Sequence, residues 1–424
     1  MNSIKYELLS RIAYVMMGQS PPSSSCSENG NGFPFIQGNA EFGARHPNPR
    51  LKCSLPTRIA EAGDLLLSVR APVGEINQAV TRTVIGRGLS AIRVDEQSRA
   101  FMWHALKWAA PQLNRVAQGS TFVAVNRQDV ERLELPWSDV FTCSRIATML
   151  NTIDALITHT EAVIAKLKQI RAGLLHDLLT RGLDENGELR DPVAHPEQFK
   201  DSSLGRIPKE WDICGILDIA PTDRQPILTG PFGAQLSQRD FVRDGIPVLR
   251  ISNVQSGYID WSGVQYVSTT KAIELKRFSI NSGDLLFARQ GATTGRNALA
   301  DKRADGVLIN YHIIRVAVDR NLCEPIFLHA LFNNEQAQRQ INRDKGRGTR
   351  EGINTVQISS LRFALPPVKE QQRAVAVLAN HDANEIQEVV ALAKLHQLKS
   401  GLITDLLTGR VRVPESIDLA ETNG

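Results

Sequence analysis

The sequence predicts a mixed α+β protein in which two β-rich domains are separated by two long antiparallel helices in a pseudo-two-fold internal repeat. Three observations support this prediction: a repeat of domain size, short apolar segments between turn-forming residues in the front part of each copy, and an uninterrupted heptad pattern in the back part. The 424 residues are 42% hydrophobic and 22% charged, which is typical of a globular chain with two or three domains.

The internal repeat is clearest in a stretch of sixteen residues. Residues 165–180 return at 393–408 with ten identical positions, at a constant offset of 228 residues. The motif Gly63-Asp64-Leu65-Leu66 also returns, as Gly283-Asp284-Leu285-Leu286, at a slightly different offset. A period of this size is that of a domain rather than of a solenoid repeat. The chain therefore consists of two copies of one unit, whose front parts have diverged in sequence and whose back parts have stayed similar.

The front part of each copy predicts a β-rich domain. Short apolar runs such as Asp64–Val69, Ile246–Ile251 and Val307–Val316 are bounded by turn-forming residues, and helical segments are embedded at Arg99–Leu113 and Pro325–Arg343. The resulting division of the chain is a first domain at 1–140, a long helix at 141–182, a polar connector at 183–207, a second domain at 208–366, a second long helix at 367–410 and a tail at 411–424.

The back part of each copy predicts a long helix with an apolar seam. Between Cys143 and Thr180 there is no Pro and a single Gly, and positions spaced alternately by four and three residues are apolar at eight of ten places. Such a helix is about 60 Å long, and the other copy is the partner expected to cover its apolar stripe. The residues assigned to the helix-pairing seam are Leu150, Ile153, Ile157, Ile164, Leu167 and Leu174 in the first copy and Ile386, Val389, Leu395 and Leu402 in the second.

Charge and cysteine content exclude several functional classes. The net charge is +4, so a surface for nucleic acid must be a local patch rather than a global field. The five cysteines are scattered without metal-ligand spacing, which predicts a reduced compartment and no metal site. Charged residues interrupt the N-terminal segment and the longer apolar stretches, which argues against a signal peptide and a membrane span.

Several motifs together resemble one protein family. They are Gly182–Arg190, His195-Pro196, Phe199–Ser202 and Leu204–Trp211 in the connector, Pro34–Ala40, Gly230–Leu236 and Gly283–Leu286 in the domains, and Leu365-Pro366-Pro367 with Glu370-Gln371 before the second helix. In this order and in duplicate, they resemble the specificity (S) subunit of type I restriction–modification systems over essentially the whole chain. The first copy departs from the pattern, because Leu135-Pro136-Trp137 lacks the second Pro and the Glu-Gln pair.

The resemblance implies a non-catalytic subunit that recognises DNA. In this family, two target-recognition domains each contact one half of a split asymmetric site, and two helices set the spacer length and dock methyltransferase subunits. The implied partners are double-stranded DNA, two methyltransferase subunits and restriction or motor subunits, with no membrane. The methyl donor, ATP and Mg²⁺ would belong to the partners, so no cofactor is expected in this chain. The implied setting is the cytoplasm of a bacterium or archaeon, with DNA methylation and phage defence as roles.

Candidate DNA-binding residues are hydrogen-bond donors on glycine-punctuated loops, because such loops deliver side chains to phosphates and base edges. The clearest cluster is Arg289–Arg296, and Arg70 is its counterpart in the first domain. A second basic cluster at 345–350 corresponds to a less basic segment near Asn126. Several of these side chains could equally satisfy loop backbone. The full set is Gln37, Asn39, Arg70, Asn126, Arg127, Arg250, Asn253, Arg289, Gln290, Thr293, Thr294, Arg296, Arg347 and Arg350.

No catalytic motif accompanies these residues. The sequence lacks GxxxxGK[ST], HExxH and the Asn-Pro-Pro-aromatic motif of adenine methylation. The spacing of Asp260, Glu274 and Lys276 resembles the carboxylate–carboxylate–lysine spacing of nucleases. Such a match is expected by chance in a chain with 45 acidic residues. The competing hypothesis is a coiled-coil adaptor whose domains bind protein. An adaptor predicts little binding to DNA, whereas a DNA reader predicts an affinity that falls steeply with salt.

Overall fold

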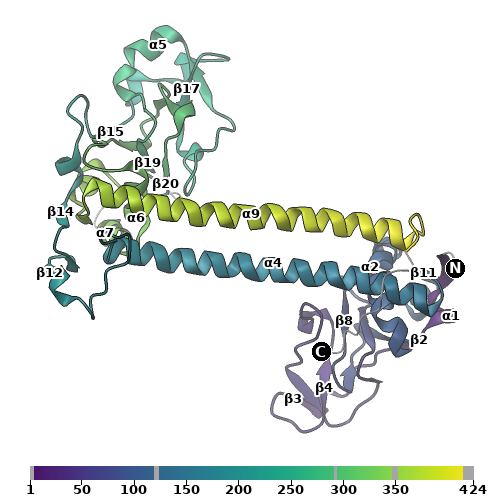
Figure 1. Cartoon of the computed structure of the whole chain (residues 1–424). Coiled ribbons are helices and arrows are strands. Elements are labelled where there is room, and N and C mark those ends of the chain that lie inside the picture. Colours follow the sequence, from purple (N-terminus) through teal and green to yellow (C-terminus); the bar gives the residue numbers. More distant parts are fainter. Residues whose placement is uncertain (1–3, 119–123, 291–293, 346–351, 414–424) are drawn as a thin grey trace. The chain divides into compact units, whose positions relative to one another are not determined.

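The structure, a computed structural model, describes residues 4–118, 124–290, 294–345 and 352–413. The chain divides into two compact units, Met1–Val163 with Glu388–Gly424, and Ile164–Gln387. Each unit holds one β-rich domain and one half of each long helix, α4 (Val140–Thr180) and α9 (Val368–Leu407) (Figure 1). The predicted helices at 141–182 and 367–410 correspond to these two elements.

The domain of unit 1 contains two sheets and a long helix. Its elements are β1 (Lys5–Leu8), α1 (Leu9–Ile12), β2 (Tyr14–Met17), β3 (Cys26–Ser27), β4 (Phe33–Ile36), β5 (Leu51–Cys53), β6 (Ile59–Ala60), β7 (Leu65–Ser68), β8 (Ile76–Gln78), β9 (Thr83–Ile85), β10 (Leu89–Arg93), α2 (Glu96–Gln118), α3 (Arg127–Glu131) and β11 (Glu134–Trp137). The sheets have the strand orders β2-β10-β7-β8 and β3-β5-β4-β9-β6, and β1 pairs with β11. The main core lies where α2 and the first half of α4 meet the first sheet, around Phe101, Leu106 and Leu150.

The connector contains a hairpin of β12 (Phe199–Ser202) and β13 (Gly205–Pro208), and the domain of unit 2 repeats the plan of unit 1 after it. The elements of this domain are β14 (Asp212–Cys214), β15 (Ile227–Thr229), β16 (Phe241–Val242), β17 (Ile246–Leu249), β18 (Gln265–Val267), α5 (Thr269–Glu274), β19 (Leu285–Ala288), β20 (Asn297–Leu299), β21 (Leu308–Ile309), β22 (Ile313–Val316), α6 (Pro325–Asn333), α7 (Glu335–Lys345), α8 (Thr355–Ser360) and β23 (Phe363–Leu365). The sheets are β15-β22-β19-β20 and β16-β18-β17-β21, and β14 pairs with β23. A core around Phe287, Phe327 and Phe332 joins the first sheet to α6 and the helix halves.

The repeated Gly-Asp motif sets the start of the central strand in each domain. Gly63 and Gly283 have φ values of +90° and +93°, a conformation that glycine adopts without steric strain. The following aspartates are buried, and each accepts a backbone N–H three residues upstream and pairs with an arginine, Asp64 with Arg93 and Asp284 with Arg224. The motif therefore builds a turn, and its repetition places β7 and β19 at equivalent positions.

Ion pairs between the long helices show an antiparallel register inside each unit. In unit 1, Asp154 pairs with Lys399, and in unit 2, Arg171 pairs with Asp382 and Lys168 approaches Glu385 at 4.0 Å. From Asp154 to Lys168 the chain advances fourteen residues along α4, and from Lys399 to Glu385 it recedes fourteen residues along α9. The offset of 228 residues converts Asp154 into Asp382 and Arg171 into Lys399. The same ion pair between the long helices therefore occurs once in each unit.

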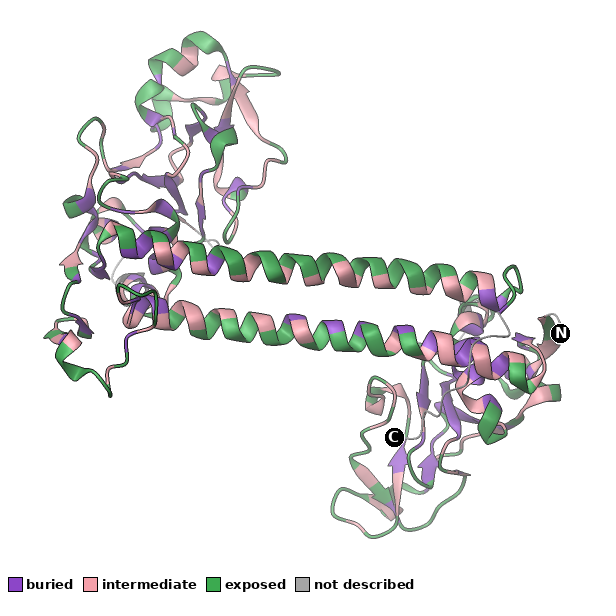
Figure 2. Ribbon diagram, in the orientation of Figure 1, coloured by how far each residue is buried: buried purple, intermediate pink, exposed green. Residues whose placement is uncertain are grey.

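The seam residues assigned on α4 all lie on its buried or half-buried side, whereas two of those assigned on α9 do not. Leu395 and Leu402 are half-buried, but Ile386 is 63% and Val389 is 47% exposed. The assignment of these two residues was wrong because charged residues, Asp382 and Glu385, occupy the facing side of α9 in this region. A count of apolar positions alone cannot find such a seam. Figure 2 shows the exposed side running along each helix.

Helix α4 is long and apolar enough to cross a membrane, judged by length and composition alone. The sequence argued against such a span because charges interrupt the apolar stretch. In the structure, 33% of the most apolar segment is buried in protein. Leu150 and Leu178 belong to the two domain cores, and Asp154 and Arg171 pair with α9. Contacts within the protein therefore account for part of its apolar and charged residues, whereas Leu156 and Ile170 are each 45% exposed.

A buried ion pair fastens the connector to the start of α9. Glu370 is 3% exposed, and its carboxylate accepts hydrogen bonds from Arg190 (2.7 and 3.1 Å), Trp211 (3.2 Å) and the backbone N–H of Leu183 (2.9 Å). Gly182 lies against this cluster with φ +63°, and a Cβ there would come within 2.1 Å of the Glu370 carboxylate. The Glu-Gln motif before the second helix thus has a structural role.

We expect the substitution Glu370→Ala to lower the free energy of unfolding by about 3 kcal/mol, because it removes the buried partner of the Arg190 guanidinium and leaves only the exposed Glu210 carboxylate, at 3.2 Å. The measurement is denaturant unfolding of the purified chain. The matched control is Glu131→Ala, which removes the partner of Arg127 in an exposed pair and should cost less than about 1 kcal/mol. Equal effects of the two substitutions would contradict the assignment of Glu370 as a buried clamp.

Candidate nucleic-acid interface

Backbone hydrogen bonds bring the ends of four strands together in unit 1. Gly18, after β2, donates to Leu89 O (2.9 Å), Val69, after β7, donates to Gly88 O (2.9 Å), and Gly86, after β9, donates to Ile36 O (2.8 Å). Space is tight, since a Cβ on Gly18 would lie 2.2 Å from a backbone oxygen. The residues that follow β2, β4, β7 and β9 are therefore held side by side.

Four polar side chains project from these strand ends, and we call Ser20, Gln37, Arg70 and Arg87 cluster one. The Ser20 hydroxyl lies 3.1 and 3.0 Å from the two amide atoms of Gln37 and accepts the backbone N–H of Arg87 at 3.2 Å. Gln37, Arg70 and Arg87 are exposed. Cluster one thus presents two guanidinium groups and an amide to solvent from one rigid base.

Unit 2 uses the same backbone hydrogen bonds at the equivalent strand ends. Gly230 donates to Ile313 O (3.4 Å), Arg289 donates to His312 O (2.9 Å), and Asn310 donates to Leu249 O (2.9 Å). These bonds correspond one to one with those of unit 1. Counting from them along the chain, Ser20, Gln37, Arg70 and Arg87 correspond to Phe232, Arg250, Gln290 and Tyr311, respectively.

The side chains at the equivalent positions of unit 2 differ in character. Three of them, Phe232, Gln290 and Tyr311, together with the adjacent Arg289 and His312, form what we call cluster two. The rings of Phe232 and Tyr311 have centroids 5.5 Å apart, and the Arg289 guanidinium lies 5.8 Å from the centre of the Tyr311 ring. His312 Nδ1 lies 2.9 Å from the Gln290 amide oxygen. Burial, and then the nearby Arg289 charge, lower the pKa of His312. Cluster two is thus aromatic, with polar groups at its edge.

Only some of the residues selected from the sequence belong to these clusters. Gln37 and Arg70 lie in cluster one, and Arg289 and Gln290 lie in cluster two. Arg250 is half-buried and donates to Gly263 O at 2.7 Å. Arg296 is exposed and donates to Gln255, Thr294 is half-buried, and Thr293, Arg347 and Arg350 lie outside the described residues.

Three of the selected residues have structural roles within the fold. The Asn126 side chain accepts the Asp129 N–H at 3.1 Å and caps α3, and Asn354 caps α8 in the same way. Arg127 pairs with Glu131 on the same helix. Asn253 is 1% exposed and donates to two backbone oxygens of its own loop. Asn253 is therefore a structural residue, because a buried amide with satisfied hydrogen bonds cannot reach a ligand.

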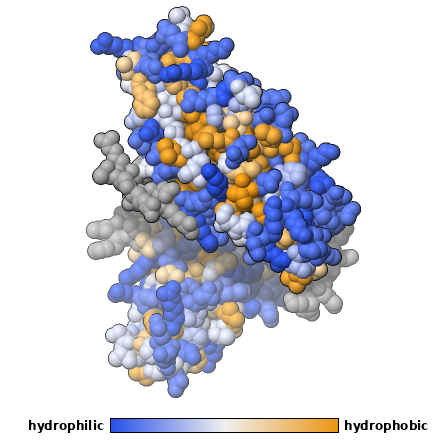
Figure 3. Space-filling view, turned by 90° about the vertical axis from the view of Figure 1, so that its left-hand side faces the viewer, coloured by the Kyte–Doolittle hydropathy of each residue, from blue (hydrophilic) through white to orange (hydrophobic). Residues whose placement is uncertain are grey.

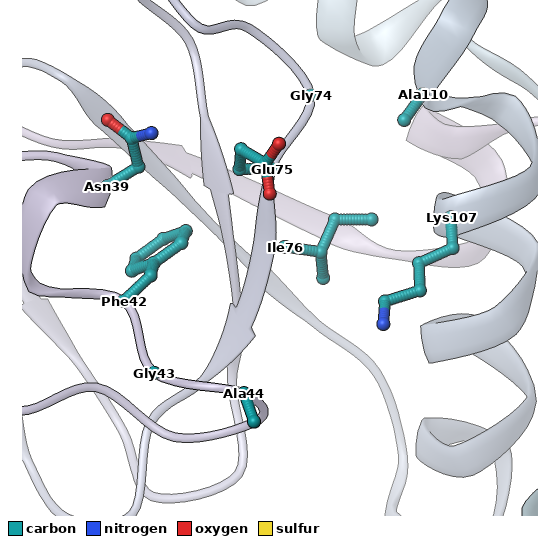
Figure 4. A pocket seen from close by; sticks show the side chains of 9 residues that line it. All are labelled: Asn39, Phe42, Gly43, Ala44, Gly74, Glu75, Ile76, Lys107 and Ala110. Carbon is teal, nitrogen blue, oxygen red and sulfur yellow. The ribbon is translucent and has the colours of Figure 1, made fainter. Parts of the chain in front are cut away.

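Asn39 lies beside a pocket of about 280 Å³ in unit 1, which Figure 4 shows with its lining residues. Lys107 reaches this pocket from α2, and its ammonium nitrogen is 4.4 Å from the centre of the Trp103 ring. Burial, and then the charge of Lys399, lower the pKa of Lys107. Asn39 thus belongs to a pocket that α2 shares, rather than to cluster one.

Sequence reasoning missed Ser20 and Arg87 in unit 1, and Phe232, Tyr311 and His312 in unit 2. A usable signal was the glycine on both sides of Arg87, in Gly86-Arg87-Gly88, since such spacing marks a residue raised on a tight loop. No signal linked Arg87 to Ser20, because only strand pairing brings them together. On the face of unit 2 in Figure 3, hydrophilic residues predominate and apolar residues gather in patches between them.

Comparison with known proteins finds several that are similar to this chain. Residues 208–396 match the family model described as type I restriction modification DNA specificity domain. The putative type I restriction enzyme MjaX specificity subunit of Methanocaldococcus jannaschii is 36% identical over 39% of this chain and 40% of that protein. The MjaVIII specificity subunit of the same organism is 22% identical over 74% of this chain and 70% of that protein. The chain thus spans less than half of the first relative and more than two thirds of the second.

A solved structure shares the fold. The crystal structure of the type I restriction–modification system S subunit from M. genitalium matches with a TM-score of 0.54 and 14% identity, over 96% of both chains. Two copies of one β-rich domain, each joined to half of a long helix pair, thus form a fold that this chain shares with that protein. Over residues 208–396 the chain is similar to the DNA specificity domain of type I restriction–modification systems.

We expect Asn126→Ala to lower the free energy of unfolding by about 1 kcal/mol, because it removes the side-chain cap of α3. The neighbouring substitution Arg127→Ala removes an exposed i,i+4 ion pair and should cost less than about 0.5 kcal/mol. Thermal or denaturant unfolding of both variants measures the difference. A negligible effect of Asn126→Ala would mean that this side chain is available for another role.

Proposed function

We propose that the chain is the DNA sequence-recognition subunit of a type I restriction–modification complex. Each β-rich domain would read one half of a split asymmetric site in double-stranded DNA. The observation that carries this proposal is the pair of clusters, which share one backbone framework and differ in side chains. A framework that is repeated with different side chains suits two readers of two different sequences.

The chemistry of the clusters fits the edges of base pairs in the major groove. Arginine recognises guanine through two acceptors, glutamine recognises adenine, and apolar side chains contact the thymine methyl group. Cluster one supplies Arg70 and Arg87, and cluster two supplies Gln290 with Phe232 and Tyr311. Since the net charge is only +4, affinity for phosphates would depend on local arginines and lysines and on the partner subunits.

We also propose that the long helices set the spacer between the half-sites and dock two methyltransferase subunits. Support comes from the outer side of the repeated segment, where Lys166, Gln169 and Gly173 are exposed and return as Lys394, Gln397 and Gly401, which are exposed as well. Exposed positions have few constraints from the fold itself. The repetition of three identical exposed residues therefore favours one kind of partner at both places.

The two helical glycines strengthen this argument. Glycine within a helix costs about 1 kcal/mol relative to alanine, and Gly173 and Gly401 both lie inside their helices. Apart from its neighbours in its own helix, a Cβ on either would meet no atom of the described residues within 4 Å. Since nothing in the described part of the chain requires a glycine there, close approach of a partner backbone is the function that fits.

The chemical steps of methylation and cleavage are assigned in this proposal to other chains. The methyl donor, ATP and Mg²⁺ would bind the methyltransferase and restriction or motor subunits, and this chain would position the DNA without a cofactor. The assembly would act in the cytoplasm of a bacterium or archaeon, in DNA methylation and phage defence. Similarity to type I restriction enzyme specificity subunits is the support for this part.

An exchange of one domain tests the proposal. The structure places the exchange points at Asp212 and Leu365, which pair with each other in β14 and β23, so the Glu370 clamp and the helices stay intact. Replacing 212–365 with the corresponding domain of another family member should change one half-site and leave the other half-site and the spacer unchanged. Methylation mapping of the assembled enzyme gives the readout, and exchange of 9–134 in unit 1 is the matched control. Changes in both half-sites, or no split site in the parent enzyme, would contradict independent reading.

A second test concerns the outer side of the helices. The substitutions Gly173→Leu and Gly401→Leu should leave the isolated chain as stable or slightly more stable, because leucine favours helix over glycine. They should weaken binding of methyltransferase subunits by at least about tenfold, equivalent to about 1.4 kcal/mol. Titration of the methyltransferase subunit into each variant measures this affinity. Ala172→Leu with Ser400→Leu adds similar bulk one residue away and serves as the control.

A further inference from the structure

We propose that Arg87 is the residue through which the first domain recognises a guanine, and that Tyr311 occupies the equivalent specificity-determining position in the second domain. This inference rests on the proposed function and goes beyond it, since it assigns base chemistry to one residue of each domain. Neither residue was found from the sequence.

The loop that carries Arg87 packs tightly against Gln37. A Cβ on Gly86 would lie 2.5 Å from the Gln37 side-chain oxygen and 2.9 Å from the Gln37 Cα, and a Cβ on Gly88 would lie 2.6 Å from the Gln37 backbone oxygen. Both glycines are buried, while Arg87 between them is exposed. The backbone N–H of Arg87 donates to the Ser20 hydroxyl at 3.2 Å. The base of the side chain is thus fixed, which reduces the ordering cost of binding.

The guanidinium of Arg87 is not committed to a carboxylate within the described part of the chain. Arg93 and Arg82 in the same domain do form ion pairs, with Asp64 and Glu61. No ion pair among the described residues includes Arg87 or Arg70. Gln37, by contrast, has both amide atoms beside Ser20. Gln37 is therefore a positioning residue, and Arg87 is the donor that faces outward.

The planar fork of an arginine matches the two acceptors that guanine presents in the major groove, O6 and N7. An arginine that is raised on a fixed loop, without a carboxylate partner, is suited to this bidentate contact. Arg70 projects from the neighbouring loop after β7 and supplies a second guanidinium for an adjacent phosphate or base. The first half-site should therefore contain a guanine whose recognition depends on Arg87.

The equivalent position in unit 2 cannot make this contact, because it carries Tyr311. The centre of this ring lies 5.5 Å from that of Phe232 and 5.8 Å from the Arg289 guanidinium. An aromatic surface of this kind suits a thymine methyl group or a base face rather than the two acceptors of guanine. The two half-sites should therefore differ at the base that contacts this position, and the difference in side chain accounts for the asymmetry of the site.

The experiment compares wild type, Arg87→Ala, Arg87→Lys and Tyr311→Ala, each assembled with methyltransferase subunits, on a library with randomised half-sites. For Arg87→Ala, preference for one G·C pair in one half-site should fall by about 5- to 150-fold, which corresponds to the loss of one bidentate contact. Arg87→Lys should relax the same pair, because it keeps the charge and loses the fork. Tyr311→Ala should change the other half-site only.

Controls separate this inference from the proposed function. Arg115→Ala removes an exposed arginine from α2 of the same domain and should leave base preferences unchanged, and thermal melting of each variant verifies folding. An Arg87→Ala enzyme with unchanged base preferences, or with affinity reduced equally for all sequences, would overturn the guanine assignment and leave DNA recognition standing. A wild-type enzyme that methylates no split site would instead overturn the proposed function.

Discussion

The ion pair between Asp154 and Lys399, repeated as Arg171 with Asp382, is the contact on which both units depend. Each unit contains one half of α4 and one half of α9, and the other half of each helix belongs to the other unit. Leu406 and Leu407, near the C-terminal end of α9, are buried in the first core beside Leu150. The first domain therefore cannot complete its core until the last helix returns antiparallel. A shift of one helix along the other would move these leucines out of the core. The charged pairs join fixed positions of α4 and α9, so they define the register between the two helices as well as adding stability.

The start of the long helix shows how the two copies adapted to different neighbours. In unit 2, Glu370 holds the connector through Arg190. The first copy lacks the Glu-Gln pair, and there Thr142 donates with its backbone and hydroxyl to Asp139 at 3.0 and 2.7 Å. These bonds lower the pKa of Asp139, as expected for an acidic helix cap. The two copies thus fasten the start of the long helix with different side chains.

The long helices could be predicted from the sequence because helical periodicity is local. Their predicted ranges agree with α4 and α9 within three residues at each end. The seam of α9 could not be predicted fully, since ion-pairing residues replace apolar ones on its facing side and leave Ile386 exposed. Clusters one and two could be predicted from the sequence only in part. Gln37 and Arg70 follow apolar strands and stand out as exposed donors, whereas Ser20 and Arg87 are 67 residues apart and meet only through strand pairing.

Duplication explains why one part of each copy stayed similar while the other diverged. The repeated helical segment has the same pattern of buried and exposed residues in both copies, and its outer side keeps Lys, Gln and Gly. This is expected if both copies bind the same kind of subunit. The strand ends keep their backbone bonds, but their side chains changed from Ser20 and Arg87 to Phe232 and Tyr311. Backbone geometry can be retained while exposed side chains vary, because the hydrogen bonds that hold the loops involve main-chain atoms. If the two domains read DNA as proposed, one copy can therefore acquire a different half-site without altering its fold.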